Sequence, residues 1–157
     1  MFRAISCFVC LALLGLALVA PNTQASLSCS EITGTTHTTG GTLDSMSGTA
    51  DSTIGGESRP ATITASITDF SAPNADGVRE AKILHRFDFG DGDSFSTSGQ
   101  ATLTPSDTAG MYRLTSPSRM TEGAGSYAES RGQVMLRGEV NLDRPESNLE
   151  VHGTICN

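Results

Sequence analysis

The chain lacks tryptophan and has little positive charge. Its 157 residues include 10 lysines and arginines against 17 aspartates and glutamates, and no basic cluster occurs along the sequence. Proteins that bind nucleic acid or an anionic membrane surface need clustered basic side chains, whose contacts release counterions. The composition therefore argues against nucleic acid as a partner, and we interpret the acidity as a solubility feature.

Helical periodicity is missing as well. Seventeen glycines and six prolines are spread along the chain, and no stretch of a dozen residues keeps apolar side chains at the i, i+3 and i+4 positions of a helix face. This absence excludes a helical bundle. It leaves strands as the expected building element of the protein.

An uncharged apolar run occupies the N-terminus, at positions 5–20. Its 16 residues fall short of the roughly 20 that a membrane-spanning helix needs, and small residues ending at Ala25 suit a signal peptidase. We predict a cleaved signal peptide over 1–25 and a single β-barrel domain over 26–157. The protein would then be periplasmic or extracellular (secreted), with no membrane span after cleavage. A retained anchor is the alternative.

Cysteine is scarce in the predicted mature chain. Cys7 and Cys10 lie in the leader, which leaves Cys29 and Cys156 near the two ends of the domain. Two cysteines in an exported domain are most simply explained by a disulfide. We expect it to join the first and last strands, with two free thiols as the alternative.

Alternating apolar and polar residues are present instead of helical stripes. The clearest alternation covers 133–142, and a second covers 149–156 after a polar turn. Softer runs occur at 29–38, 43–54, 62–68, 83–89, 101–104 and 110–116. About eight short strands with hairpin-length links predict an all-β fold, an eight-stranded antiparallel β-barrel, with a sandwich as the alternative.

Two segments between these runs carry turn signals. The sequence Gly90-Asp91-Gly92-Asp93 tolerates the positive φ angles of a tight hairpin turn. Positions 33–58 hold many threonines and glycines with little hydrophobic mass, and we interpret them as a polar hairpin or mobile loop.

Several stretches resemble a known family. They are Gly123–Gly132, the alternation Val134–Val140, the closing Val151–Cys156 and the stretch His85–Phe95. Together they are similar to small exported bacterial proteins of the allene oxide cyclase barrel-like (calycin-like, dirigent-like) group. The resemblance implies a calycin-like, eight-stranded barrel. Plant relatives in that group include a cyclase acting on a fatty-acid epoxide, but the matching glycines and apolar residues concern the fold and carry over no catalytic residue.

The glycines of Gly123-x-Gly125-x-x-Ala128 are followed by a strand, so a dinucleotide loop is disfavoured. We expect them to form tight bends at the barrel end, with Tyr127 folding over it.

A small set of side chains could contact a ligand in the lumen. His85 alternates with Phe87, so both should face the apolar interior. A histidine there could act as a general base or orient a ligand, although a hydrogen-bonded core histidine is the plainer explanation. With Arg113 and Tyr127 these residues are our candidate ligand-binding set. No Ser-His-Asp or Cys-His arrangement can be proposed, so no catalytic residue is named and a non-enzymatic role is favoured.

Three carboxylates, Asp88, Asp91 and Asp93, lie close together around the predicted turn. Three nearby carboxylates could bind calcium, but Phe95 stands where a calcium loop needs its third ligand. A solvated acidic hairpin is favoured, and we expect neither a metal nor a cofactor.

We therefore expect an exported barrel that binds a small apolar ligand or serves as an envelope or secreted accessory protein. One alternative is an isomerase or cyclase acting on a lipid-like substrate in the lumen. Another is a structural or interaction module with a filled core. The volume of the lumen discriminates among them, and the sequence does not indicate an oligomeric state.

Overall fold

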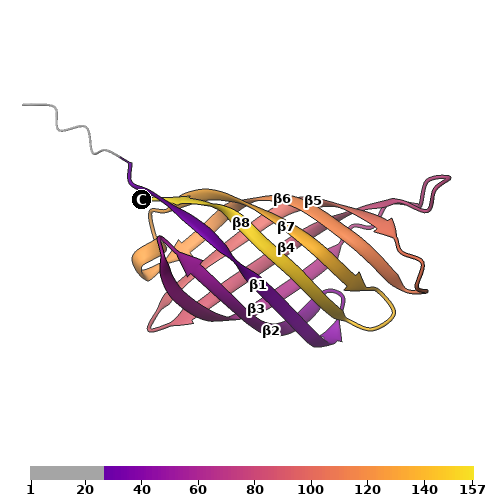
Figure 1. Ribbon diagram of the computed structural model, residues 1–157, viewed down its shortest axis with the longest axis horizontal. Helices are drawn as coiled ribbons and strands as arrows, with labels where there is room; N and C mark the ends of the chain where they lie inside the picture. Colours follow the sequence, from indigo (N-terminus) through magenta and orange to yellow (C-terminus); the bar gives the residue numbers. More distant parts are fainter. Residues whose placement is uncertain (1–26) are drawn as a thin grey trace, which may run out of the picture.

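The computed structural model describes residues 27–157, which form one closed barrel of eight strands (Figure 1). The predicted signal peptide lies outside the described residues. The strands are β1 (Cys29–Thr42), β2 (Ser45–Ile54), β3 (Glu57–Thr68), β4 (Arg79–Gly90), β5 (Asp93–Pro105), β6 (Met111–Ala124), β7 (Arg131–Asn141) and β8 (Glu146–Cys156). A single turn of 3-10 helix, η1 (Gly125–Tyr127), follows β6. The predicted fold class, an eight-stranded antiparallel barrel, is confirmed.

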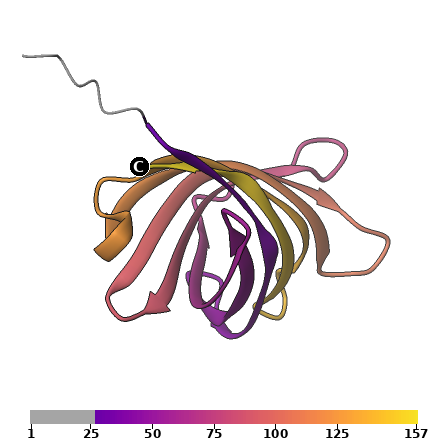
Figure 2. The same cartoon turned by 60° about the vertical axis from the view of Figure 1, so that its left-hand side comes forward.

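Each strand pairs antiparallel with the next strand in the sequence, and β1 pairs with β8 to close the barrel. Figure 2 shows β1 and β8 side by side along this closing seam. The register there runs from Cys29 opposite Cys156 to Thr39 opposite Glu146. Closure satisfies the backbone groups that an edge strand would leave open to another chain.

The turn between β4 and β5 forms where the sequence predicts it. Gly90, Asp91 and Gly92 have φ angles of 79°, 52° and 86°, which glycine adopts without strain and aspartate tolerates better than most residues.

The prediction of a mobile loop within 33–58 is wrong, because this segment forms the long strands β1 and β2. The polar-hairpin alternative is the one that the structure shows. The inward side chains here include Thr36, Thr38 and Ser52, all buried. Small polar residues therefore take several inward positions of β1 and β2, beside the apolar Ile32, Met46 and Ala50, and they weaken the apolar alternation there.

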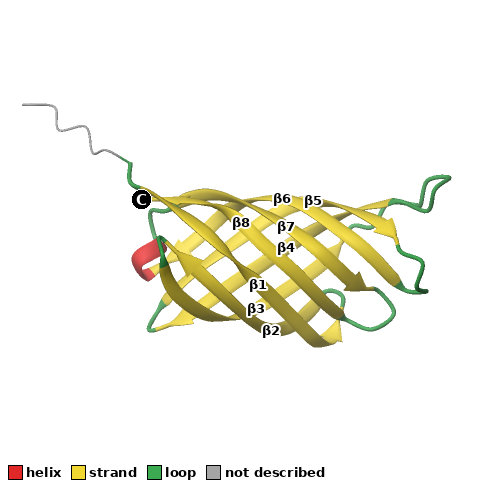
Figure 3. Ribbon diagram, viewed as in Figure 1, coloured by secondary structure: helices red, strands yellow, loops and turns green. Residues whose placement is uncertain are grey.

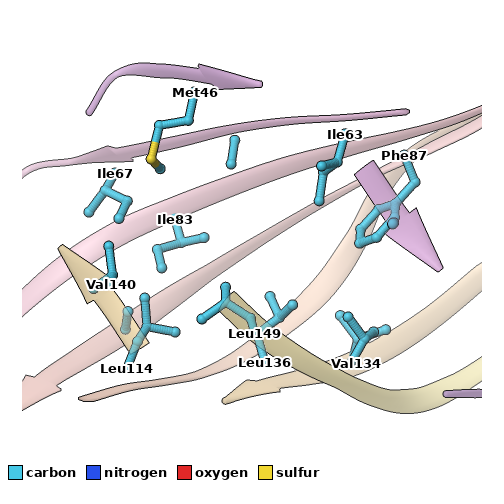
Figure 4. Packing of buried hydrophobic residues seen from close by; sticks show 14 of the residues in the cluster. Met46, Ile63, Ile67, Ile83, Phe87, Leu114, Val134, Leu136, Val140 and Leu149 are labelled. Carbon is cyan, nitrogen blue, oxygen red and sulfur yellow. The ribbon is translucent and has the colours of Figure 1, made fainter. Parts of the chain in front are cut away.

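The interior of the barrel is a packed core. Inward side chains of all eight strands form one cluster whose apolar members are at most 9% exposed, and many are not exposed at all. In Figure 4 these side chains, among them Met46, Ile83 and Leu136, converge from the surrounding strands. An open lumen would leave them in contact with a water-filled void. The core is instead filled as in other small barrels whose interior is just wide enough for side chains.

The two ends of the barrel differ. One end, which we call the lid end, carries η1, the links β2–β3, β4–β5 and β6–β7, and the Cys29–Cys156 pair. The opposite end, which we call the pocket end, carries the four links β1–β2, β3–β4, β5–β6 and β7–β8. Figure 3 shows the helical turn at one end and the longest loops at the other.

Candidate functional site

The lid end is fastened by a disulfide. Cys29 and Cys156 face each other in the β1–β8 register and are joined by a bond of 2.07 Å between their sulfur atoms. Their Cα atoms lie 4.0 Å apart, slightly closer than disulfides usually bring them. The predicted crosslink between the first and last strands is confirmed. It joins the start of β1 to the end of β8, both at the lid end.

The turn η1 covers the same end, and glycines let it approach. A Cβ atom on Gly123 would lie 1.9 Å from the carbonyl oxygen of Tyr127, and one on Gly125 would lie 2.2 Å from Oδ1 of Asp93. Any larger residue at either position would push the turn away from the barrel. Tyr127 is thereby held against the barrel end and is buried, as the glycine pattern predicts.

Asp93 holds this turn in place. The Asp93 carboxylate accepts two hydrogen bonds from Ser126, one from the backbone N–H at 2.8 Å and one from the side-chain hydroxyl at 2.6 Å. It also accepts one from Nη2 of Arg59 at 2.9 Å. The Ser126 hydroxyl and N–H, followed by the Arg59 guanidinium, lower the pKa of Asp93 to about 2. The predicted acidic hairpin thus includes one carboxylate that is committed to a structural contact.

Stacked rings complete the closure. The ring centroids of Phe87 and Phe95 are 4.8 Å apart, and Tyr127 lies 5.5 Å from Phe95 and 5.3 Å from Phe89. The guanidinium of Arg59 sits 5.2 Å from the Phe89 ring centre, within the range of a cation–π contact. The lid end is therefore closed by aromatic packing, and this cluster is structural.

His85 lies deep in the same interior. It is 4% exposed, its Nδ1 has no hydrogen-bond partner within residues 27–157, and burial lowers its pKa to about 4. Thr97 faces it across the β4–β5 pair and also buries a hydroxyl without a partner. The lowered pKa leaves the imidazole uncharged at neutral pH, and the side chain is buried. His85 is also among the residues that line a hollow of about 470 Å3 on the barrel wall.

The structure brings together three of the four candidate ligand-binding residues. The His85 and Phe87 rings are 6.3 Å apart, and Phe87 is connected to Tyr127 through Phe95. Arg113 lies elsewhere: it is exposed on the outward side of β6, opposite Thr104 and Glu139. The four side chains therefore do not surround a common cavity, and the first three are part of the packed core.

A hollow at the pocket end has a different character. Its volume is about 380 Å3 and all four links of this end contribute to it. We call it the rim pocket; its lining residues are Leu43, Phe70, Arg79, Gly110, Tyr112, Leu142 and Asp143. The volume lies in the range of small-molecule sites.

Apolar side chains form much of the rim pocket. Phe70, Tyr112 and Leu142 are half-buried and pack on the core beneath. Two backbone hydrogen bonds fix the surrounding links: Leu142 N–H donates to Gly110 O at 2.8 Å, and Ile67 N–H donates to Leu43 O at 2.7 Å. The pocket is thus built on backbone that is tied to neighbouring strands, which favours a preformed site.

Two charged residues also line the rim pocket. Arg79 lies two positions before the buried Ala81 of β4, so it belongs to the inward-facing register at the rim. Its Nε is buried without a hydrogen-bond partner among the described residues. Asp143 lies in the β7–β8 link, and within residues 27–157 no ion pair joins it to Arg79. The pocket therefore offers a guanidinium that no acidic side chain neutralises directly.

Larger hollows of about 470 to 550 Å3 cross the outer wall of the barrel. They lie over paired strands. Serine, threonine and charged residues make up most of the lining of two of them, whereas Ala50, Pro60, Ala61 and Phe89 are part of the lining of the third. The rim pocket combines half-buried rings with a charged group and is the better candidate.

The rim pocket was not found by sequence reasoning. Its residues stand at the ends of strands, separated by up to a hundred positions, and only barrel closure brings them together. One signal was available: Leu43, Phe70 and Leu142 are large apolar residues placed in or beside links at the same end. Apolar residues in links on one end of a barrel suggest a site there, because loops otherwise favour polar residues.

Comparison with known proteins finds no matching family model, no similar curated protein and no similar solved structure. Within residues 27–157, no helix has the length and apolar character needed to cross a membrane.

Proposed function

We propose that the protein is an exported binding protein that takes up a small, largely apolar molecule in the rim pocket. The observation that carries this proposal is the assembly of Phe70, Tyr112 and Leu142 around a hollow of about 380 Å3 at one end of an otherwise solid barrel. Rings and aliphatic side chains that stay half-exposed gain free energy when a ligand covers them, at about 25 cal/mol per Å2 of apolar surface.

The asymmetry of the barrel supports the same function. The lid end is held by a disulfide, the Asp93 hydrogen bonds and stacked rings. Among the described residues the pocket end has no such cover, and it presents four surface links, where sequence changes disturb the core least. A rigid scaffold with its binding residues at one end is a common design for ligand sites.

Export is part of the proposal. The Cys29–Cys156 disulfide supports it, because such bonds persist in oxidising compartments and are rare in the cytosol. We expect protein recovered from outside the cytoplasm to begin at Ser26, which an intact-mass measurement would test. Retention of residues 1–25 would contradict cleavage.

The cyclase alternative loses support from the packed interior. An enzyme that shapes a lipid-like substrate in its lumen needs a cavity there, and the side chains around His85 are fully packed. Membership of the allene oxide cyclase barrel-like group stays a proposal that rests on the sequence resemblance. If the protein belongs to that group, its ligand contacts lie at the rim and not in the lumen.

A second function, a structural or interaction module, is favoured by the filled core itself. A solid barrel needs no ligand to be stable, and its outer wall could serve a protein partner. The two functions make different predictions for small molecules. Only the binding function predicts saturable uptake of an apolar probe at the pocket end.

The test is to fill the rim pocket and leave the wall unchanged. Leu142→Trp places a larger ring in the pocket, whereas Leu84→Trp puts the same ring on the outer wall, where Leu84 is 39% exposed. Binding of 2-naphthamide is followed by fluorescence or calorimetry. We expect Leu142→Trp to weaken binding at least about tenfold, equivalent to about 1.4 kcal/mol, and Leu84→Trp to leave it unchanged. Equal affinities for both variants would contradict a site at the rim.

A further inference from the structure

Arg79 gives the rim pocket a chemical preference that apolar packing alone does not. It is placed at the rim by strand β4, opposite Leu103 of β5, and its side chain lines the pocket beside aromatic and aliphatic residues. The described residues form two ion pairs, Arg59 with Asp93 and His152 with Glu150, and Arg79 takes part in neither.

The contrast with Arg59 shows what is missing at Arg79. Arg59 has a carboxylate at 2.9 Å and two rings beneath it. Arg79 has a buried Nε that donates to no described group. Leaving a buried donor unpaired is costly, more so for a charged group, and a ligand carboxylate removes this cost once the side chain turns enough to expose Nε to the pocket. A guanidinium matches a carboxylate particularly well, because two parallel N–H groups meet its two oxygens.

We infer that the rim pocket selects small organic acids, with the carboxylate on Arg79 and an apolar body against Phe70, Tyr112 and Leu142. The inference deepens the proposed function and rests on it. Asp143 lies in the same pocket but is exposed to solvent. Its backbone N–H donates to Oδ1 of Asn141. Its charge is therefore screened by water, whereas the Arg79 head is partly withdrawn from it.

The charge selectivity is testable with two probes of the same shape. 2-Naphthoate and 2-naphthamide share a flat apolar body, and only the acid is charged at pH 7. A carboxylate can form two charge-assisted hydrogen bonds with a guanidinium, so we expect the acid to bind at least about tenfold more tightly than the amide, a difference of about 1.4 kcal/mol.

Variants of two arginines assign that preference to its source. Arg79→Gln should remove the preference for the acid while the amide still binds. Arg79→Lys should keep only part of the preference, because an ammonium group lacks the paired, parallel N–H donors of a guanidinium. Arg113→Gln is the matched control, since Arg113 is exposed on the outer wall. It should retain the full preference. Thermal unfolding of each variant confirms that the barrel is intact.

The outcomes separate the two claims. Tighter binding of the acid that depends on Arg79 supports the inference. Equal binding of acid and amide at the rim overturns the inference and leaves the proposed function standing. A preference that survives Arg79→Gln also overturns it. Failure of both probes to bind overturns the proposed function, and the inference with it.

Discussion

His85 and Thr97 face each other across strands β4 and β5, and each buries a polar atom that has no hydrogen-bond partner in the described part of the chain. The pair sits inside the packed barrel, 4% and 0% exposed. Such a pair costs stability, because a buried polar group that loses its water partners is not compensated. We therefore expect an apolar residue at either position to make the core more stable.

The buried histidine makes the stability of the barrel depend on pH. Burial lowers the pKa of His85 to about 4, from an ordinary value of 6.5. The unfolded chain therefore takes up a proton as the pH falls below 6.5, whereas the folded chain does not until about pH 4. The free energy of unfolding contributed by this group is complete above pH 6.5 and should fall by up to about 3 kcal/mol on acidification to pH 4.

Replacement of the histidine tests this dependence. His85→Leu should remove the loss of stability between pH 6.5 and 4, and raise the free energy of unfolding at pH 7 by about 1 kcal/mol. His152→Leu serves as the control, because His152 is exposed on the outer wall. Denaturant titrations at several pH values measure both. An unchanged pH slope in His85→Leu would mean that another group is responsible.

The disulfide should contribute to stability and not to binding. Replacing Cys29 and Cys156 together by serine should lower the free energy of unfolding by about 2 to 5 kcal/mol. The affinity for 2-naphthoate should stay the same, because the bond lies at the lid end and the rim pocket at the other. Two free thiols in a denaturing, non-reducing titration of the purified protein would show that the bond does not form.

Asp93 should control the mobility of the lid turn. Asp93→Asn removes the charge that pairs with Arg59 and weakens the acceptor for Ser126. We expect faster hydrogen exchange at the Ser126 amide, with Asp91→Asn in the same hairpin as the control. The low pKa of Asp93, about 2, means that its contribution is present above pH 3.8 and lost as the pH falls toward 2. Unchanged exchange in Asp93→Asn would show that the stacked rings alone hold the turn.

The fold was largely predictable because apolar and polar residues alternate along most of its strands. Val134, Leu136 and Val140 point inward as their spacing predicts, and the Cys29–Cys156 pair follows from closure of the barrel. The β1–β2 hairpin was harder, since Thr36 and Thr38 replace apolar residues on its inward face. Apolar periodicity is therefore a weaker signal in strands where polar residues take some of the inward positions.

The candidate site was less predictable than the fold. Alternation shows that His85 faces inward, but not whether the space in front of it is filled, because packing depends on residues of several distant strands. The rim pocket depends on Arg79, which starts β4, on Tyr112, the second residue of β6, and on Phe70 in a loop. Their proximity follows from the closure and register of the whole barrel, and no local pattern encodes it.

The rim pocket predicts that a small molecule binds at one end of a solid barrel. Intermolecular nuclear Overhauser effects, measured on methyl-labelled protein with bound 2-naphthoate, test it most directly. We predict contacts from the naphthyl protons to the methyl groups of Leu43 and Leu142, which line the rim pocket. Contacts to Ile63 or Leu136, which lie in the packed interior, would show that the lumen opens to ligands and would contradict the account.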